Sequence, residues 1–253
     1  MGKEEIEDLI FYYVKVLKYL KNYLRGREIA VKNYIPNGPI LIKRGSQLEP
    51  LYVDEILKHA NKHFLEIRKK VEHLKDAKKY LNKYQIKIWE YFLPRKLCEL
   101  LYATNHEGPN KPINRIFIDI DRTKRSLDEA RIVTLKLLNL FEKSKEFKES
   151  IGKHKILITY TGHSFHIHIL LLKSITKNIY NELFSKKENI FTKFCQEIRS
   201  GIGFKVVLGH IKTKEGINID PSQTPSGKLS RAPFSLHIKD AKTIDGITVP
   251  INK

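Results

Sequence analysis

Residues 115–122 have the sequence RIFIDIDR, in which three isoleucines alternate with Phe117, Asp119 and Asp121. Alternation with a period of two is typical of a β-strand that buries one face. It places the isoleucines on one face and both carboxylates on the other. Two like charges on one strand face repel each other and are costly to remove from water. A divalent cation bound by both would relieve that cost, since Mg²⁺ prefers oxygen ligands. The alternative is an edge strand with two solvated aspartates.

Composition limits the class of protein. The chain has 253 residues, of which 41% are hydrophobic and 10% aromatic, as expected for a folded protein with one large or two modest domains. No run of about 18 apolar residues occurs, so we expect no membrane span. The acids at positions 4 and 5 stand where a signal peptide would be basic. We therefore expect an intracellular, cytoplasmic protein.

The charge and the cysteines indicate what the chain binds. Lys and Arg total 47 against 28 Asp and Glu, a net charge of +19. This excess predicts a polyanionic partner, with nucleic acid as the first choice and an acidic membrane surface as the second. Cys98 and Cys195 are the only cysteines, and two thiols cannot form a Cys-rich zinc site. We expect no zinc and a nucleoid-associated location.

Hydrophobic periodicity divides the chain into two regions at the Gly- and Pro-rich loop 105–112. Before the loop we expect helices and two short strands. The helices are expected at 3–25, 53–84 and 85–102, the last interrupted at Pro94, and the strands at 27–31 and 39–43. The predicted domains are a helix-rich N-terminal region at 1–107, with a short β segment at 27–45, and an α+β core at 108–253. We expect the two to form one compact unit.

The second region alternates strands and helices. Ser126 and Glu129 fit a capping box that opens a helix to about residue 147. The remaining elements are strands at 155–160 and 165–170 around a turn, a helix at 177–199, and strands at 217–220 and 234–238. This order predicts a mixed β-sheet with helices to one side, an α+β fold.

Asp220 ends the alternating strand 217–220 and is followed by a turn. If this strand lies beside 115–122, three carboxylates come together. That is the ligand set of a two-metal site, which stabilises the attacking and leaving oxygens of a phosphoryl displacement. A single Asp at a turn is otherwise ordinary.

Two further clusters offer hydrogen-bond donors. His166 and His168 point to the same side of the strand 165–170. They could be a pair of metal ligands, His166 could donate to a phosphate beside Ser164, or both could simply pack in the sheet. The other cluster, near the C-terminus, combines donors with no carboxylate, which suits a triphosphate, although an ordinary amphipathic strand has the same pattern. Its members are Arg231, Ser235, His237 and Lys239.

Over residues 113–240 the chain resembles the archaeo-eukaryotic primase superfamily. The resemblance rests on three motifs in order: Asp119-x-Asp121, then Ser164-x-His166, then Asp220 followed by Arg231 and Ser235-x-His237-x-Lys239. It implies a mixed-sheet core with an RRM-like half. It also implies that Asp119, Asp121 and Asp220 are catalytic and bind two divalent metals, Mg²⁺ or Mn²⁺. The implied nucleotide-binding residues are Ser164, His166, Arg231, Ser235, His237 and Lys239. The turn at 161–164 departs from the family pattern, and the family's Cys-rich zinc motif is absent.

The resemblance implies a DNA-template-dependent nucleotidyltransferase, a primase or primase-polymerase that adds NTPs or dNTPs to a 3′-hydroxyl. Its partners would be single-stranded or primed DNA and a primase large subunit, a helicase or a ligase. One alternative is a gap-filling end-joining repair polymerase. Another is a rolling-circle endonuclease that uses His166 and His168 with Tyr160 or Tyr180 as nucleophile. The third is a non-catalytic primase accessory subunit.

Overall fold

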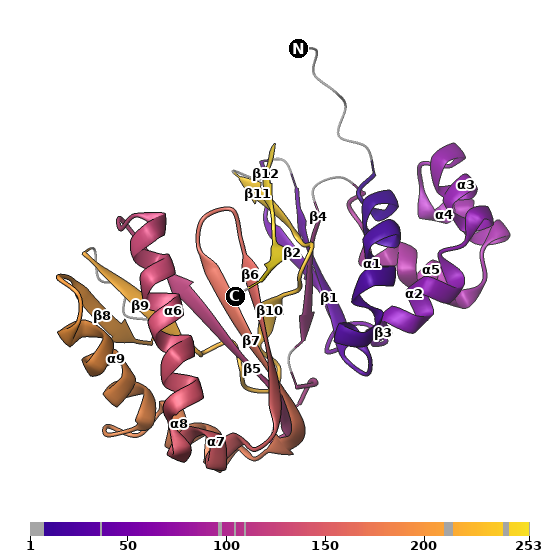
Figure 1. Cartoon of the computed structure of the whole chain (residues 1–253). Coiled ribbons are helices and arrows are strands. Elements are labelled where there is room, and N and C mark those ends of the chain that lie inside the picture. The colour runs from indigo at the N-terminus through magenta and orange to yellow at the C-terminus, as the bar shows by residue number, and fades with distance from the viewer. Residues whose placement is uncertain are drawn as a thin grey trace. The chain divides into compact units, whose positions relative to one another are not determined.

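The computed structural model describes residues 8–35, 37–95, 98–103, 105–108, 110–209, 215–239 and 243–252. The chain forms two compact units, each with its own hydrophobic core (Figure 1). The first unit comprises Met1–Ala103 and Arg231–Ile247, and the second comprises Thr104–Ser230 and Thr248–Lys253. The first unit is therefore built from two separate segments of the chain.

The first unit contains an antiparallel sheet in the order β4–β1–β2, with β3 also paired to β1. The strands are β1 (Glu28–Tyr34), β2 (Ile40–Lys43), β3 (Leu51–Tyr52) and β4 (Cys98–Ala103). The helical elements are α1 (Ile10–Leu24), α2 (Val53–His59), α3 (Lys62–Lys70), α4 (Leu74–Ala77), the 3₁₀ turn η1 (Lys78–Tyr80) and α5 (Lys83–Tyr91). A hairpin of β11 (Leu236–Lys239) and β12 (Thr243–Ile247) contributes Leu236 and Ile238 to this core.

Tyr13 of α1 connects the two segments of this unit. Its hydroxyl donates to the carbonyl of Cys98 at 2.8 Å and accepts from the amides of Leu100 and Leu236 at 2.9 and 3.3 Å. The ring is fully buried, so these bonds replace the water that a phenol would otherwise bind. Burial raises the pKa of this phenol well above its usual value.

The expected helix over 85–102 is wrong in its second half. Helix α5 ends at Tyr91, and residues 98–103 form β4, which pairs with β1 through partners such as Tyr102 and Ile29. Pro94 lacks the amide that would continue the helix and restricts the residue before it. The expected helix over 53–84 is divided into short helices, two of which begin at the asparagine caps Asn61 and Asn82.

The second unit contains a six-stranded sheet in the order β13–β6–β7–β5–β9–β8. Its strands are β5 (Ile113–Asp121), β6 (His154–Tyr160), β7 (Phe165–Ile175), β8 (Lys205–Leu208), β9 (Gly216–Asp220) and β13 (Val249–Ile251). All neighbours are antiparallel except β8 and β9, which are parallel. The short strand β10 (Leu229–Arg231) leads the chain from this unit back into the first.

Four helices cover one face of this sheet (Figure 1). They are α6 (Leu127–Lys143), α7 (Lys145–Ile151), α8 (Lys177–Phe184) and α9 (Ile190–Ser200). The isoleucines of β5 at 116, 118 and 120 lie in the core beneath them. The amide of Glu129 donates to the Ser126 hydroxyl at 3.1 Å and the Ser126 amide to the Glu129 carboxylate at 2.7 Å, so the predicted capping box is formed.

The order strand, helix, two strands, helix, strand across β5, β6, β7 and β9 is that of a split β-α-β fold, in which β5 and β7 are central. The expected α+β class and the mixed sheet with helices to one side are confirmed. None of the described helices has both the length and the apolar character needed to cross a membrane.

Candidate active site

Asp119 and Asp220 are direct partners across the antiparallel pair of β5 and β9. Directly opposite residues of such a pair point to the same face of the sheet, with Cβ atoms about 5 Å apart. Because the isoleucines of β5 point toward the helices, both carboxylates lie on the other face. The strand adjacency of these two predicted site residues is therefore present in the fold.

His166 extends this row on the other side of Asp119. It is the β7 partner of Asp119, and its Nε2 lies 3.5 Å from the Asp119 Oδ1. The His166 side chain is 10% exposed and the Asp119 side chain 40% exposed, so the carboxylate reaches solvent while the imidazole is mostly covered. Phe117 packs edge-on against the His166 ring at 4.9 Å and fixes its orientation. The row Asp220–Asp119–His166 thus crosses three strands.

Asp121 lies one step further along β5, and its partner on β9 is Asn218. Asn218 shares a face with Asp220, because the two are separated by two residues on one strand. Only 2% of Asn218 is exposed. The polar face of the sheet therefore carries two neighbouring cross-strand pairs, Asp119 with Asp220 and Asp121 with Asn218.

The side chains of Asp121 and Asp220 are each held in place by a hydrogen bond from a nearby backbone amide. The amide of Ser222 donates to Oδ1 of Asp220 at 2.9 Å, and the amide of Thr123 donates to Oδ1 of Asp121 at 3.1 Å. In both cases an Asp side chain accepts from an amide two residues later, as in an Asx turn. Each of the two carboxylates keeps a second oxygen that this turn bond does not use.

The donor set fits a hard divalent cation in its chemistry. Asp119, Asp121 and Asp220 supply only oxygen ligands, and like charges directly opposite each other in a sheet are destabilising without a counter-charge. The oxygens of these three described residues do not all lie within 4.8 Å of one another. The three acids thus lie on adjacent strands and on one face of the sheet, as expected, but their oxygens are not gathered at one point.

The other predicted residues of the second unit, Ser164, His166 and His168, have different surroundings. Ser164 precedes β7, and its hydroxyl donates to the carbonyl of Ile120, the residue between the two acids of β5. His168 has no exposed surface, and its Nε2 lies 3.4 Å from the Thr159 hydroxyl. Packing in the sheet, one of the three interpretations considered for the histidines, thus describes His168. His166 faces the acids.

The C-terminal cluster of predicted residues belongs to the first unit. Arg231 lies 3.5 Å from the carboxylate of buried Glu99, which also pairs with Lys32 at 3.1 Å. Ser235 is buried and its hydroxyl donates to the carbonyl of Leu100 in β4. These two side chains are thus held by the sheet of their own unit.

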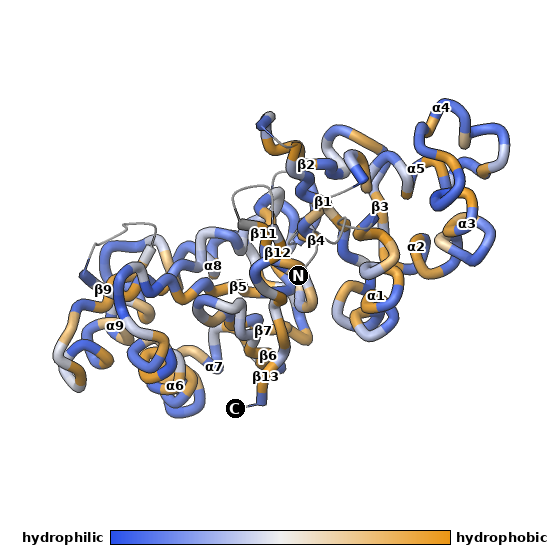
Figure 2. Tube along the Cα trace, turned by 90° about the horizontal axis from the view of Figure 1, so that it is seen from above, coloured by the Kyte–Doolittle hydropathy of each residue, from blue (hydrophilic) through white to orange (hydrophobic). Residues whose placement is uncertain are grey.

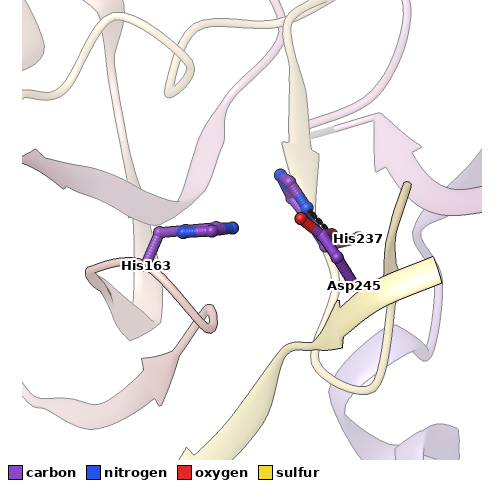
Figure 3. Close-up of side chains that lie close together, drawn as sticks. All are labelled: His163, His237 and Asp245. Carbon is purple, nitrogen blue, oxygen red and sulfur yellow. Dashed lines mark hydrogen bonds and ion pairs between the residues drawn. The ribbon is translucent and has the colours of Figure 1, made fainter. Parts of the chain in front are cut away.

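His237 is bonded through Nδ1 to Asp245 of the neighbouring strand (Figure 3). The register of β11 and β12 shifts between His237 and Ile238, so simple alternation does not continue along the strand. Lys239 ends β11, and its side chain lies outside the described residues. That all four members of the cluster bind one nucleotide stays a prediction.

Three residues close to predicted site residues were not predicted from the sequence. Asn218 has a visible signal, since it precedes Asp220 by two residues on an alternating strand. Glu99 and Asp245 have none, because their pairing with Arg231 and His237 depends on strand contacts between distant parts of the chain.

A cavity of about 560 Å³ opens beside the end of β9. Asp220 and Ser222 form part of its lining together with residues of α8, α9 and β8. Tyr180 lies in the same lining and donates to the carbonyl of Pro221 at 3.2 Å. Burial, and then the nearby Asp220 carboxylate, raises the pKa of Tyr180. This phenol is therefore poorly suited to act as a nucleophile.

The fold is similar to that of a solved polymerase. The polymerase domain of Ligase D from Mycobacterium tuberculosis, in complex with DNA, superimposes with a TM-score of 0.59 at 13% sequence identity. The match covers 97% of this chain and 80% of that one. No family model matches the sequence, and no curated protein matches it either. The similarity is thus one of fold, extending over nearly the whole chain.

Proposed function

We propose that the chain is a DNA-template-dependent nucleotidyltransferase whose active site is formed by Asp119, Asp121 and Asp220. The observation that carries this proposal is the direct pairing of Asp119 with Asp220 on adjacent strands, next to Asp121 on the same face. The similarity in fold to a solved polymerase domain supports it.

The reaction requires the carboxylates to hold two divalent cations, Mg²⁺ or Mn²⁺. When bound, such cations neutralise charge on the triphosphate and activate the 3′-hydroxyl. Asp119 and Asp220, which face each other, would hold the cations together with Asp121 beside them. His166 orients Asp119 through the 3.5 Å contact and offers a donor to a phosphate oxygen.

The template or primer is held by the basic helices of the first unit. Residues 58–83 carry many exposed lysines, and the segment around α4 is predominantly hydrophilic (Figure 2). Tyr80 is 49% exposed with the Lys79 ammonium 5.0 Å from its ring centre, and Lys83 lies 5.0 Å from the ring of Tyr84. Lysines that neutralise phosphates, interleaved with aromatic rings that accept bases, suit a nucleic-acid strand.

Two modes of synthesis are consistent with this site. A primase starts a strand without a primer, whereas a gap-filling repair polymerase extends one and prefers a 5′-phosphate on the downstream strand. The solved structure with a similar fold is the polymerase domain of Ligase D, and this supports gap filling as the second candidate. A separate ligase, helicase or primase large subunit is the corresponding partner in each mode.

The experiment compares nucleotide incorporation on unprimed, primed and gapped DNA, with NTPs or dNTPs and Mg²⁺ or Mn²⁺. We expect incorporation in the wild type and a loss of at least about a thousandfold in Asp119→Ala. Products on unprimed DNA identify a primase, and products that require a primer and increase with a 5′-phosphate identify the repair polymerase. Equal activity of wild type and Asp119→Ala refutes the site assignment, and a covalent tyrosine–DNA adduct would establish the nuclease instead.

A further inference from the structure

Asn218 is buried beside the acids with a polar atom that the protein does not satisfy. Its side-chain oxygen has less than 1 Å² of exposed surface and no hydrogen-bond partner among the residues that the structure describes, and the residue is 2% exposed. Buried side-chain oxygens in folded proteins nearly always accept a hydrogen bond, because leaving one unpaired costs the free energy of its lost hydration. An exception next to three carboxylates requires an explanation.

The strand partners of Asn218, taken from the described part of the chain, have no side-chain donor. Across β5 its partner is Asp121, and an ionised carboxylate only accepts hydrogen bonds. Across β8 its partner is Val207, whose side chain is apolar. Asp220, two residues further along the same strand, is a second acceptor. By strand register Asn218 therefore lies beside two carboxylates and an apolar side chain, and a cation is a group that would satisfy its oxygen and both carboxylates.

We propose that the side-chain oxygen of Asn218 is a fourth protein ligand of the divalent-cation site, beside Asp121. The inference rests on the proposed function, since it takes the three aspartates as the other ligands. Asparagine carbonyls are ordinary ligands of hard cations. A neutral fourth oxygen adds coordination without adding a fourth negative charge to carboxylates that already repel one another.

The test is equilibrium titration of the full-length chain with Mn²⁺, in which free Mn²⁺ is measured by its electron paramagnetic resonance signal. Neither DNA nor nucleotide is present, so the result does not depend on catalysis. Asn218→Leu keeps the branched shape and the number of side-chain heavy atoms, although it is larger, and it has no polar atom; we expect it to bind Mn²⁺ about tenfold more weakly. Asn218→Asp restores an oxygen and adds a charge, and we expect it to bind at least as tightly as wild type.

Thermal unfolding without metal separates this role from a structural one. Removing an unsatisfied buried oxygen should leave the melting temperature of Asn218→Leu equal to or above that of wild type. If that variant does not fold, Asn218→Ala takes its place with the same expected loss of affinity. Asn181→Leu on α8, an asparagine outside the site, is the matched control and should bind Mn²⁺ as wild type does.

The outcomes distinguish the inference from the proposed function. If Asp119→Ala loses Mn²⁺ binding while Asn218→Leu and Asn218→Ala bind as tightly as wild type, Asn218 is not a ligand and the aspartate site stands. If wild type and Asp119→Ala are equally unable to bind Mn²⁺, both are overturned. Weaker binding in Asn218→Leu with retained binding in Asn218→Asp supports the inference.

Discussion

Asp119 and Asp220 face each other across two antiparallel strands, an arrangement that is unfavourable for two ionised carboxylates. Cross-strand pairs of like charge typically destabilise a sheet by some tenths of a kcal/mol up to about 1 kcal/mol. A protein that keeps such a pair gives up stability at that position. Cations bound at the proposed site would restore this lost stability, because a ligand that binds only the folded state stabilises that state.

This leads to a prediction for Asp220→Asn. The amide keeps the oxygen that accepts from Ser222 but removes one of the two facing charges. In EDTA the variant should be more stable than wild type by about 0.5 kcal/mol, whereas millimolar Mn²⁺ should raise the melting temperature of wild type only. Incorporation should be lost. The measurement is thermal unfolding with and without Mn²⁺.

Glu149→Gln, which removes an exposed charge on α7, is the control and should change neither stability nor activity. A lower melting temperature of Asp220→Asn in EDTA would show that the facing carboxylates do not repel each other appreciably.

The two cysteines should be unreactive in the folded protein. Burial raises the pKa of Cys195 to about 12 and raises that of Cys98 further. Because the thiolate is the reacting species, a raised pKa means that very little of either thiol is ionised at pH 8. We expect no reaction with an aromatic disulfide reagent between pH 7 and 9, and two thiols per chain after denaturation. Rapid labelling of the native protein at pH 8 would contradict the burial of these side chains.

The elements differ in how far local sequence predicts them. Strand β5 and helix α6 follow from patterns within a few residues, the alternating isoleucines and the Ser126–Glu129 capping box. Strand β4 does not, because the sequence at 98–103 is compatible with a helix and becomes a strand through pairing with β1. The residues of the candidate site likewise differ in whether local sequence or long-range pairing identifies them.

Both acids of β5 are recognised from the strand alone, whereas their partnership with Asp220 joins residues about a hundred positions apart. It could be anticipated only through the resemblance to a known family. The unpaired oxygen of Asn218 was beyond any sequence pattern, because it depends on which side chains flank it on two neighbouring strands. Local patterns thus identify candidate residues, and long-range pairing determines how they are combined.

The basic helices of the first unit lead to a prediction about salt. Replacing three exposed lysines, Lys78, Lys79 and Lys83, by glutamine removes three charges around η1 and the start of α5. If each contacts one phosphate, the slope of log affinity for duplex DNA against log salt should become less steep by about 0.9 per lysine. The measurement is fluorescence anisotropy of labelled DNA from 50 to 300 mM salt.

The matched control replaces Lys143, Lys145 and Lys148, which lie on or between α6 and α7 of the second unit. It removes the same charge from the chain. Equal effects of the two triple variants would mean that only the net charge matters and that the helices of the first unit provide no specific surface.

At the level of the whole molecule, the first unit is incomplete without a late segment of the chain. Residues 231–247 supply Leu236 and Ile238 to its core and the Leu236 amide to the hydroxyl of Tyr13. A fragment of residues 1–107, which follows the boundary expected from the sequence, lacks all of these. We therefore expect this fragment to unfold at a lower temperature and with less cooperativity than the first unit in the intact chain.

A second variant tests whether the second unit folds without residues 231–247. Replacing residues 231–247 by a flexible linker of roughly ten residues leaves its core residues in place, since none of them comes from that segment. Circular dichroism should show a cooperative unfolding transition for this variant. Its absence, or a 1–107 fragment as stable as the first unit of the intact chain, would contradict the division into units.

Because the first unit is built from two separate segments of the chain, it cannot be completed early during synthesis on the ribosome. Residue 231 emerges roughly 130 residues after residue 103, which at about 5–20 residues per second is a delay on the order of ten seconds. During that interval the Tyr13 side of α1 and the edge of β4 lack the hairpin that later covers them. The second unit is completed only by β13 at the far end of the chain. The nascent chain therefore exposes apolar surface from both units at the same time, and a chaperone that shields it should increase the yield of folded protein.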